Sequence, residues 1–232
     1  MSTFDLTKGP LPGFHWHCEP KSFTYGPAGL EIVTDENTDF WQRPQEGIRR
    51  DNGHFYFTRS AGDFVLKATL AFVPEVQYDQ CGLMVRVDAE NWIKCSLEYE
   101  NESFGRLGSV VTNRGHSDWA THDVPTTIRE ASYQIRRTGA GFLVEQSFDG
   151  GPFRQMRDTR LHEAEGEVAL GVYACSPKRG GFRCVVRELS IAPSSSFRDT
   201  ASENHQKQEP RNYPCLNHSP AHPTAAAVPI WR

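Results

Sequence analysis

Residues 78–99 read YDQCGLMVRVDAENWIKCSLEY, and this stretch decides the fold. It holds two runs of alternating apolar and polar residues, separated by the polar segment Asp88-Ala89-Glu90. Successive side chains of a β-strand point to opposite faces. Each run therefore gathers its apolar residues on one face: Cys81, Leu83, Val85 and Val87 in the first, and Ile93, Cys95 and Leu97 in the second. The two runs predict an antiparallel hairpin with one buried face.

The register of this hairpin follows from the same pattern. Opposite residues share a face, and both apolar sets occupy odd positions, so the two numbers of each pair must sum to an even value. A loop at 88–90 with Val87 opposite Asn91 meets this condition and gives these pairs: Gln80 with Glu98, Gly82 with Ser96, Met84 with Lys94, and Arg86 with Trp92. A loop at 89–91 also meets it but opposes Arg86 to Lys94, two like charges, which is less favourable.

The same strand pattern continues over the first 192 residues. Eight further segments alternate in this way: 29–34, 54–58, 64–73, 109–112, 133–137, 142–148, 167–175 and 182–191. Glycine-containing turn signals such as Asp51-Asn52-Gly53 separate them. Residues 161–164 form the best candidate for a short helical turn, and there is no internal repeat of 20–50 residues. Residues 1–192 are therefore expected to form an all-β antiparallel sandwich, in which two sheets cover each other's apolar faces.

The composition changes near Pro193. The last 40 residues hold 6 of the 15 prolines and four residues of the Val, Ile, Leu or Phe type. Such a segment buries too little apolar surface to offset its chain entropy. We expect 193–232 to be a disordered tail, with the apolar end at 225–231 as a possible short docking segment.

Charge and targeting signals exclude several classes of partner. The chain has 25 Lys and Arg against 29 Asp and Glu, a net charge of −4. We therefore expect neither a nucleic-acid partner nor binding to an anionic membrane. Residues 1–19 lack a basic stretch followed by an apolar run, so we expect no secretory signal and a cytoplasmic location. The six cysteines lack CxxC spacing and are expected to be buried small hydrophobes.

The even-numbered face of the 78–99 hairpin carries an indole among polar groups: Gln80, Arg86, Trp92, Lys94 and Glu98. Sugars present apolar C–H patches that stack on aromatic rings, and hydroxyls that need fixed donors and acceptors. This face is therefore a candidate carbohydrate-binding surface. The alternative is a solvated outer face with a Lys94–Glu98 ion pair.

Several motifs, in order, resemble one family. They are Asp39-Phe40-Trp41, Asp79-Gln80-Cys81-Gly82-Leu83-Met84, Trp92-Ile93-Lys94-Cys95-Ser96-Leu97-Glu98, Ser109-Val110-Val111-Thr112-Asn113, Ser117-Asp118-Trp119, Ser147-Phe148-Asp149-Gly150 and Ala174-Cys175-Ser176-Pro177. Together they resemble the regulation-of-enolase-protein-like domains of unknown function, from about residue 10 to 192. The resemblance implies a concanavalin A-like lectin/glucanase jelly roll with a groove over its concave sheet. It implies no reaction.

The resemblance also implies a set of ligand-binding residues: Asp39, Trp41, Gln80, Trp92, Lys94, Glu98, Asp118 and Trp119. Asp118 and Trp119 are adjacent, so in an extended strand only one of them can point into the groove, and we favour Trp119. Ser96 stands where the family usually has a glycine or another small residue, which puts close backbone approach in doubt at that position.

Carboxylates at alternate positions, Glu98, Glu100 and Glu102, resemble the Glu-x-Asp-x-Glu strand of some glucanases with this fold. Glycoside hydrolysis ordinarily takes two carboxyl groups, about 5–5.5 Å apart for retention and about 6.5–9.5 Å apart for inversion. If the protein is an enzyme, we expect a retaining glycoside hydrolase with Glu98 as a catalytic carboxylate. Glu100 and Glu102 stand at the strand end and can equally be loop residues.

The histidines supply only pairs of candidate metal ligands, His15 with His17 and His116 with Asp118, so we expect no metal and no cofactor. Three functions remain. The first is binding of a carbohydrate or sugar-like metabolite without catalysis. The second is an interaction protein that holds a metabolic enzyme as its partner, as the family's name suggests, and the third is the hydrolase.

Overall fold

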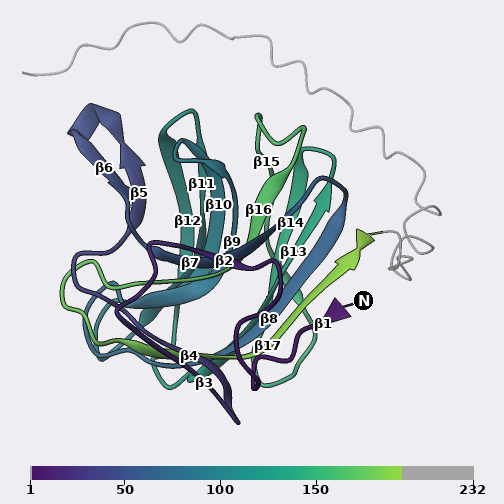
Figure 1. Ribbon diagram of the computed structural model, residues 1–232. Helices are drawn as coiled ribbons and strands as arrows, with labels where there is room; N and C mark the ends of the chain where they lie inside the picture. Colours follow the sequence, from purple (N-terminus) through teal and green to yellow (C-terminus); the bar gives the residue numbers. More distant parts are fainter. Residues whose placement is uncertain (1, 195–232) are drawn as a thin grey trace, which may run out of the picture. The chain divides into compact units, whose positions relative to one another are not determined.

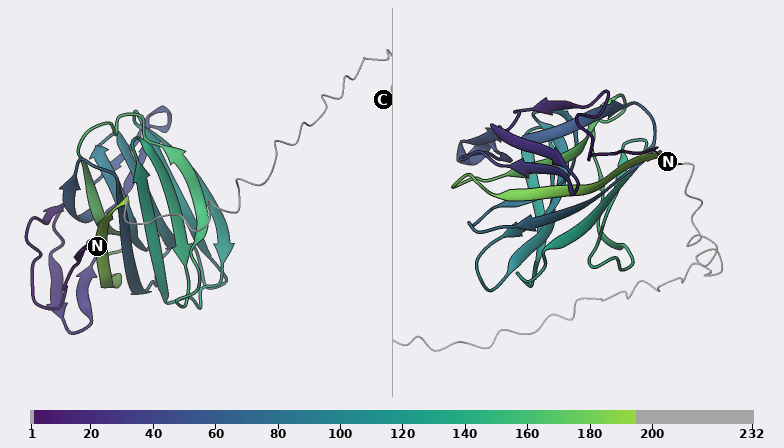
Figure 2. Two further views of the ribbon diagram at one scale, coloured as in Figure 1. Left: turned by 90° about the vertical axis from the view of Figure 1, so that its right-hand side faces the viewer. Right: turned by 60° about the horizontal axis from the view of Figure 1, so that its bottom comes forward.

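The computed structural model describes residues 2–194, which form two facing antiparallel sheets and one small hairpin (Figure 1). The eight-stranded sheet runs in the order β15 (Arg154–Arg160), β14 (Gly141–Ser147), β13 (Glu130–Thr138), β8 (Phe64–Val73), β17 (Arg183–Pro193), β4 (Gly29–Val33) and β3 (Ser22–Gly26), with β1 (Ser2–Thr3) paired to β17. Its strands lie side by side in the left panel of Figure 2.

The seven-stranded sheet packs against it. Its order is β12 (His116–Val124), β11 (Gly105–Asn113), β10 (Asn91–Tyr99), β9 (Gln80–Asp88), β16 (Val168–Cys175), β7 (His54–Ser60) and β2 (His15–His17). The hairpin joins β5 (Phe40–Arg43) to β6 (Ile48–Asp51) through the 3-10 turn η1 (Pro44–Glu46). In Figure 1 the hairpin stands on the side of the seven-stranded sheet that faces away from the eight-stranded sheet. The expected all-β jelly-roll sandwich is confirmed.

The main core fills the space between the two sheets. The odd-numbered residues of β9 and β10 that the sequence pattern placed inward lie in it, together with alternate residues of β8 and β13: Cys81, Leu83, Val85, Ile93, Cys95, Leu97, Leu66, Leu70, Ala131 and Ile135. Tyr133 of β13 accepts a hydrogen bond at its hydroxyl from the Leu97 backbone N–H, 2.8 Å away, and so joins the two layers inside the core. The alternation therefore assigns the buried face correctly.

The predicted hairpin register is confirmed at Gln80–Glu98, Gly82–Ser96, Met84–Lys94 and Arg86–Trp92. The turn differs, because Asp88 rather than Val87 lies opposite Asn91 and the register shifts between Asn91 and Trp92. The Asp88 carboxylate accepts hydrogen bonds from the Glu90 backbone N–H at 2.8 Å and from the Asn91 amide at 3.0 Å. These bonds stabilise a tighter turn, and Val87 becomes the extra residue of a bulge.

Close backbone approach explains the glycines in the middle of the seven-stranded sheet. A Cβ atom at Gly82 would lie 1.8 Å from the Cys95 carbonyl oxygen, and one at Gly171 would lie 2.0 Å from that of Tyr56. No side chain fits there, so both positions require glycine. Ser96, which pairs with Gly82, is buried, so its side chain fits while the two strands approach closely.

Of the seven described strands that the alternation pattern missed, β1, β5 and β6 are short pieces outside the main strand order, and the other four share a position. β15 and β3 are the edges of one sheet and β12 and β2 are the edges of the other. Edge strands bury little surface, and β12, for example, is exposed at most positions. They therefore lack the apolar alternation by which a strand is recognised.

The end of the sandwich lies close to the expected boundary. β17 runs to Pro193, one residue into the predicted tail, and the rest of that tail beyond Ser194 lies outside the described residues. Within residues 2–194, no helix is long and apolar enough to cross a membrane. Four cysteines are buried as expected, whereas Cys18 is exposed after edge strand β2, in a left-handed backbone conformation. Cys215 is outside the described residues.

Candidate functional site

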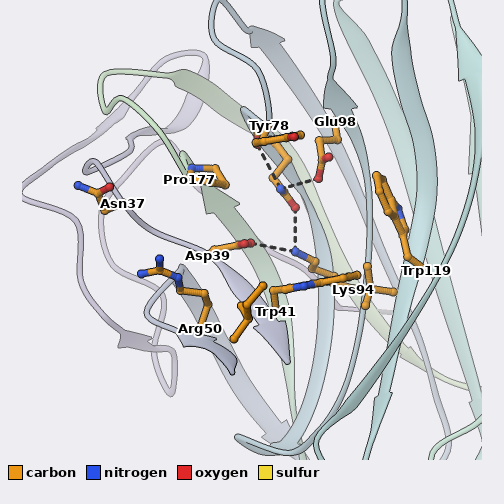
Figure 3. Close-up of a pocket in the computed structure, with 12 residues that line it drawn as sticks. Asn37, Asp39, Trp41, Arg50, Tyr78, Lys94, Glu98, Trp119 and Pro177 are labelled. Atoms are coloured by element: carbon orange, nitrogen blue, oxygen red, sulfur yellow. Dashed lines mark hydrogen bonds and ion pairs between the residues drawn. The ribbon is translucent and has the colours of Figure 1, made fainter. Parts of the chain in front are cut away.

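The outer face of the seven-stranded sheet holds a pocket of about 400 Å³. Its base is formed by the even-numbered residues of β9 and β10 and by Val110 of β11, and its sides by the hairpin, β12 and three loops (Figure 3). The residues that line it are Asn37, Asp39, Trp41, Ile48, Arg50, Tyr78, Gln80, Lys94, Glu98, Val110, Trp119 and Pro177. The pocket thus lies on the face that the sequence predicted as the ligand surface.

A chain of four polar side chains crosses the base of the pocket. The Lys94 ammonium, 4% exposed, donates to Asp39 Oδ1 at 3.3 Å and to Gln80 Oε1 at 3.0 Å. Gln80 Nε2 donates to Glu98 Oε2 at 2.7 Å (Figure 3). The Tyr173 hydroxyl, from the buried strand β16, also donates to Gln80 Oε1, at 3.0 Å. The Gln80 amide therefore has donors at its oxygen and an acceptor at its nitrogen, which fixes its orientation.

Glu98 titrates close to neutral pH. Burial raises the pKa of its carboxyl to about 7, because the charged form loses water, and the nearby Lys94 ammonium only partly offsets this. Asp39 has other hydrogen-bond partners, because its carboxylate accepts from the Lys94 ammonium and from the Phe40 backbone N–H, 2.8 Å away. The pocket thus holds two carboxyl groups with different environments.

Two indoles form the apolar walls. Trp41 comes from β5, and Trp119 comes from β12, where it pairs with Val110 of β11. Their ring centroids lie 6.2 Å apart at an interplanar angle of 80°, so one ring runs below the polar chain and the other stands beside it (Figure 3). The Arg43 guanidinium lies 4.8 Å from the Trp41 ring centroid. Both half-buried rings offer apolar surface to a ligand.

Trp92 does not line the pocket. Its ring is fully buried in a second apolar cluster on this face, with Phe40 at a centroid distance of 6.3 Å, and its Nε1 donates to the Ala89 carbonyl. The cause is Phe40, whose segment folds over this end of the sheet. Trp92 therefore supports the hairpin from below, and its expected role as a stacking surface goes to Trp41 and Trp119.

Asp118 does not line the pocket either. It pairs with Val111 while Trp119 pairs with Val110, so the two side chains point to opposite faces, and Trp119 is the one that enters the pocket. The Asp118 carboxylate is 73% exposed and forms an ion pair with Arg157 at 2.6 Å.

Of the two alternatives for Glu100 and Glu102, strand or loop, the structure supports the loop. β10 ends at Tyr99, so Glu100 and Glu102 belong to the following loop and do not line the pocket. Glu100 bonds the Arg106 guanidinium at 2.9 Å, which lowers its pKa. Among residues 2–194, no group of three or more His, Cys, Asp and Glu could hold a metal ion.

Sequence reasoning did not single out six of the pocket residues: Asn37, Ile48, Arg50, Tyr78, Val110 and Pro177. Three of them come from loops, two come from the hairpin, and Val110 comes from β11. The hairpin has a sequence signal: the runs at 40–43 and 48–51 flank the segment Pro44-Gln45-Glu46-Gly47, in which Gly47 has a positive φ of 71°. A short Gly-containing connection between two such runs is typical of a β-hairpin.

Several known proteins are similar to this chain. It is 30% identical over 176 residues to Regulation of enolase protein 1 of Saccharomyces cerevisiae, covering 76% of this chain and 87% of that protein. A solved structure of a functionally unknown protein from Saccharomyces cerevisiae matches with a TM-score of 0.72 and 29% identity, over 78% of this chain and 96% of that one.

Two more distant solved structures share the fold. The glycoside hydrolase family 43 protein BlXynB (K247S mutant) of Bacillus licheniformis matches with a TM-score of 0.65 at 13% identity, over 82% of this chain and 39% of that one. Carbohydrate-binding module CBM66 of Bacillus subtilis matches with a TM-score of 0.50 at 12% identity, over 76% of this chain and 94% of that one. The family model for proteins of unknown function, DUF1349, matches residues 16–194. The chain therefore belongs to the DUF1349 family, as the regulation-of-enolase-like motifs indicated.

Proposed function

We propose that this pocket binds a carbohydrate or a sugar-like metabolite without acting on it chemically. The observation that carries the proposal is the pair of indoles, Trp41 and Trp119, set at 80° beside a fixed chain of polar groups. A sugar ring stacks its C–H face on one indole and presents its hydroxyls to the amide and carboxyl groups. A volume of about 400 Å³ falls within the usual range for small-molecule pockets.

Buried polar groups give this arrangement its specificity. Gln80 and Lys94 are already hydrogen-bonded within the chain, so they need not reorganise when a ligand enters. Groups held in place before binding lower the entropic cost of association. The sandwich fold shared with carbohydrate-binding module CBM66 agrees with this use of the face, although likeness at 12% identity concerns the fold alone.

The arrangement supports binding better than hydrolysis. Of the pocket residues, only Asp39 and Glu98 carry carboxyl groups, and the Lys94–Gln80 pair stands between them at the base. Asp39 is engaged by an ammonium ion, which weakens it as a nucleophile or base. We expect no turnover of chromogenic glycosides, and turnover that Glu98→Gln abolishes would replace binding by a hydrolase function.

A second candidate function follows from the yeast relative, whose name refers to regulation of enolase. Ile48 at the hairpin is one of two large hydrophobic residues exposed among those described, and it lies at the rim of the pocket. In this second function, Ile48 is the apolar residue of the pocket rim that a metabolic enzyme would contact.

The test is a thermal-shift screen of the full chain against a library of sugars and sugar metabolites. We expect at least one ligand to raise the melting temperature, and Trp119→Ala to abolish this shift. The matched control is Phe153→Ala, which removes an aromatic ring packed on Lys67 of the other sheet and should leave the shift unchanged. If no sugar shifts the wild-type chain, or if Trp119→Ala leaves the shift intact, the proposal fails. Recovery of a metabolic enzyme that Ile48→Ser releases would then favour the second function.

A further inference from the structure

The two ends of the pocket differ in charge. Glu98 and Gln80 form one end, where they are hydrogen-bonded to each other and offer polar groups to a ligand. Arg50 and Asn37 lie at the other end, away from Glu98 and Trp119 (Figure 3). A ligand that fills the pocket therefore meets a cationic group at the hairpin end.

Arg50 is distinguished from the neighbouring cations by its lack of a partner. Lys94 is buried against Asp39, Arg49 pairs with Glu90 at 3.4 Å, and Arg106 pairs with Glu100 at 2.9 Å. No acceptor among residues 2–194 lies within hydrogen-bonding distance of the Arg50 guanidinium, which is exposed at the rim. Its five N–H donors are free to bind a ligand.

The register of the hairpin sets Arg50 beside the stacking surface. Arg50 of β6 pairs directly with Trp41 of β5, and paired residues project from the same face of a sheet. Side chains in such a pair have their Cβ atoms about 4.5–5.5 Å apart. One ligand can therefore rest its ring on Trp41 while a substituent on that ring reaches Arg50.

We propose that the pocket selects sugars that carry an anionic group, a carboxylate or a phosphate, and that Arg50 binds this group. The inference rests on the proposed function and names its ligand class. A guanidinium matches both anions through two parallel N–H···O hydrogen bonds. The anion lies at the Arg50 end, because the guanidinium of Arg50 has no ion-pair partner among residues 2–194 whereas Lys94 is bound to Asp39, and the sugar hydroxyls lie toward Glu98.

The experiment uses isothermal titration calorimetry of the full chain to compare the affinities of matched sugars. The probes are glucose and galactose, their uronates and their 6-phosphates. We expect an anionic member of at least one series to bind about tenfold or more tighter than its neutral parent, because hydrogen bonds between charged groups are stronger than those between neutral groups. The uronate and phosphate arms show which anion is preferred. The preference should shrink as ionic strength rises.

Arg50→Gln should reduce this preference to less than about twofold while leaving the binding of the neutral sugar unchanged. The matched control is Arg49→Gln, which removes the adjacent exposed arginine, paired with Glu90 and absent from the pocket, and should preserve the preference. Equal binding of neutral and anionic sugars, or a preference that survives Arg50→Gln, overturns this inference and leaves the proposed function standing. No binding of any probe overturns this inference, and an additional absence of any shift in the thermal-shift screen overturns the proposed function as well.

Discussion

The outer faces of the two sheets have similar composition and opposite character. On the eight-stranded sheet, Arg183 pairs with Glu31 at 2.8 Å and Arg187 with Glu130 at 2.9 Å, and all four side chains are more than a third exposed. On the seven-stranded sheet, Lys94 is 4% exposed and is tied to Asp39 and Gln80. Both faces alternate polar residues with core residues, yet one is solvated and the other is a site.

The difference comes from what covers the sheet. The β5–β6 hairpin lies against the seven-stranded sheet, where the Gln42 backbone N–H donates to Ser117 Oγ at 3.0 Å and Gln42 Nε2 donates to the Ala89 carbonyl at 3.2 Å. This cover removes water from Lys94, which is 4% exposed and bonded to Asp39 beside the hairpin. Exposed ion pairs contribute about 0–1 kcal/mol to stability, whereas removing one partner of a buried pair costs several times more. The cover, rather than the strand pattern, therefore makes the site.

Lys94→Met should have the largest effect. The substitution leaves the Asp39 carboxylate without its ammonium partner in a partly buried place, so we expect a loss of about 3 kcal/mol in the free energy of unfolding. Urea unfolding at pH 7 measures it. The double variant with Asp39→Asn should recover part of the loss, because no unpaired charge remains. A single variant as stable as the wild type would mean that this face is solvated after all.

The next effect concerns Glu98 and depends on pH. Its pKa is raised from 4.5 to about 7, so the folded chain binds this proton more tightly than the unfolded chain. The resulting stabilisation is complete below pH 4.5 and is lost as pH rises to 7. The free energy of unfolding of the wild type, relative to that of Glu98→Gln, should therefore fall by about 1–3 kcal/mol across this window. Urea unfolding at intervals of one pH unit measures it.

Glu100 gives a control of opposite sign, two residues away. Its pKa is lowered by Arg106, so its stabilisation is present above pH 4.5 and disappears as pH falls below that value. The free energy of unfolding of the wild type, relative to that of Glu100→Gln, should therefore fall in acid. A flat pH dependence for Glu98→Gln would show that burial does not raise the pKa of Glu98.

The sequence is informative where one face of a strand is buried and less so elsewhere. The register of β9 and β10 could be predicted because Cys81, Leu83 and Val85 in one strand and Ile93, Cys95 and Leu97 in the other all occupy odd positions. The four edge strands could not, since their side chains meet mostly solvent and the alternation disappears.

The same reasoning separates the site residues. Gln80, Lys94 and Glu98 were placed together because strand parity alone brings them to one face. Trp92 has the same parity but is covered by Phe40, and Arg50 depends on where the hairpin lies against the sheet. The positions of both residues depend on contacts between segments distant in the chain, and strand parity does not predict such contacts. Local periodicity thus predicts a face, whereas tertiary cover decides which of its residues meet a ligand.

The smallest effect is expected on the solvated face. Arg187→Met removes the same charge as Lys94→Met and leaves Glu130 unpaired, but both side chains remain in water, 56% and 38% exposed. Water replaces the lost partner, so the free energy of unfolding should change by less than about 0.5 kcal/mol, in the same urea assay. Lys94→Met and Arg187→Met thus differ mainly in whether the β5–β6 hairpin covers the substituted residue. A loss at Arg187 as large as that at Lys94 would contradict the role assigned to the cover, because the charge pair alone would then be sufficient.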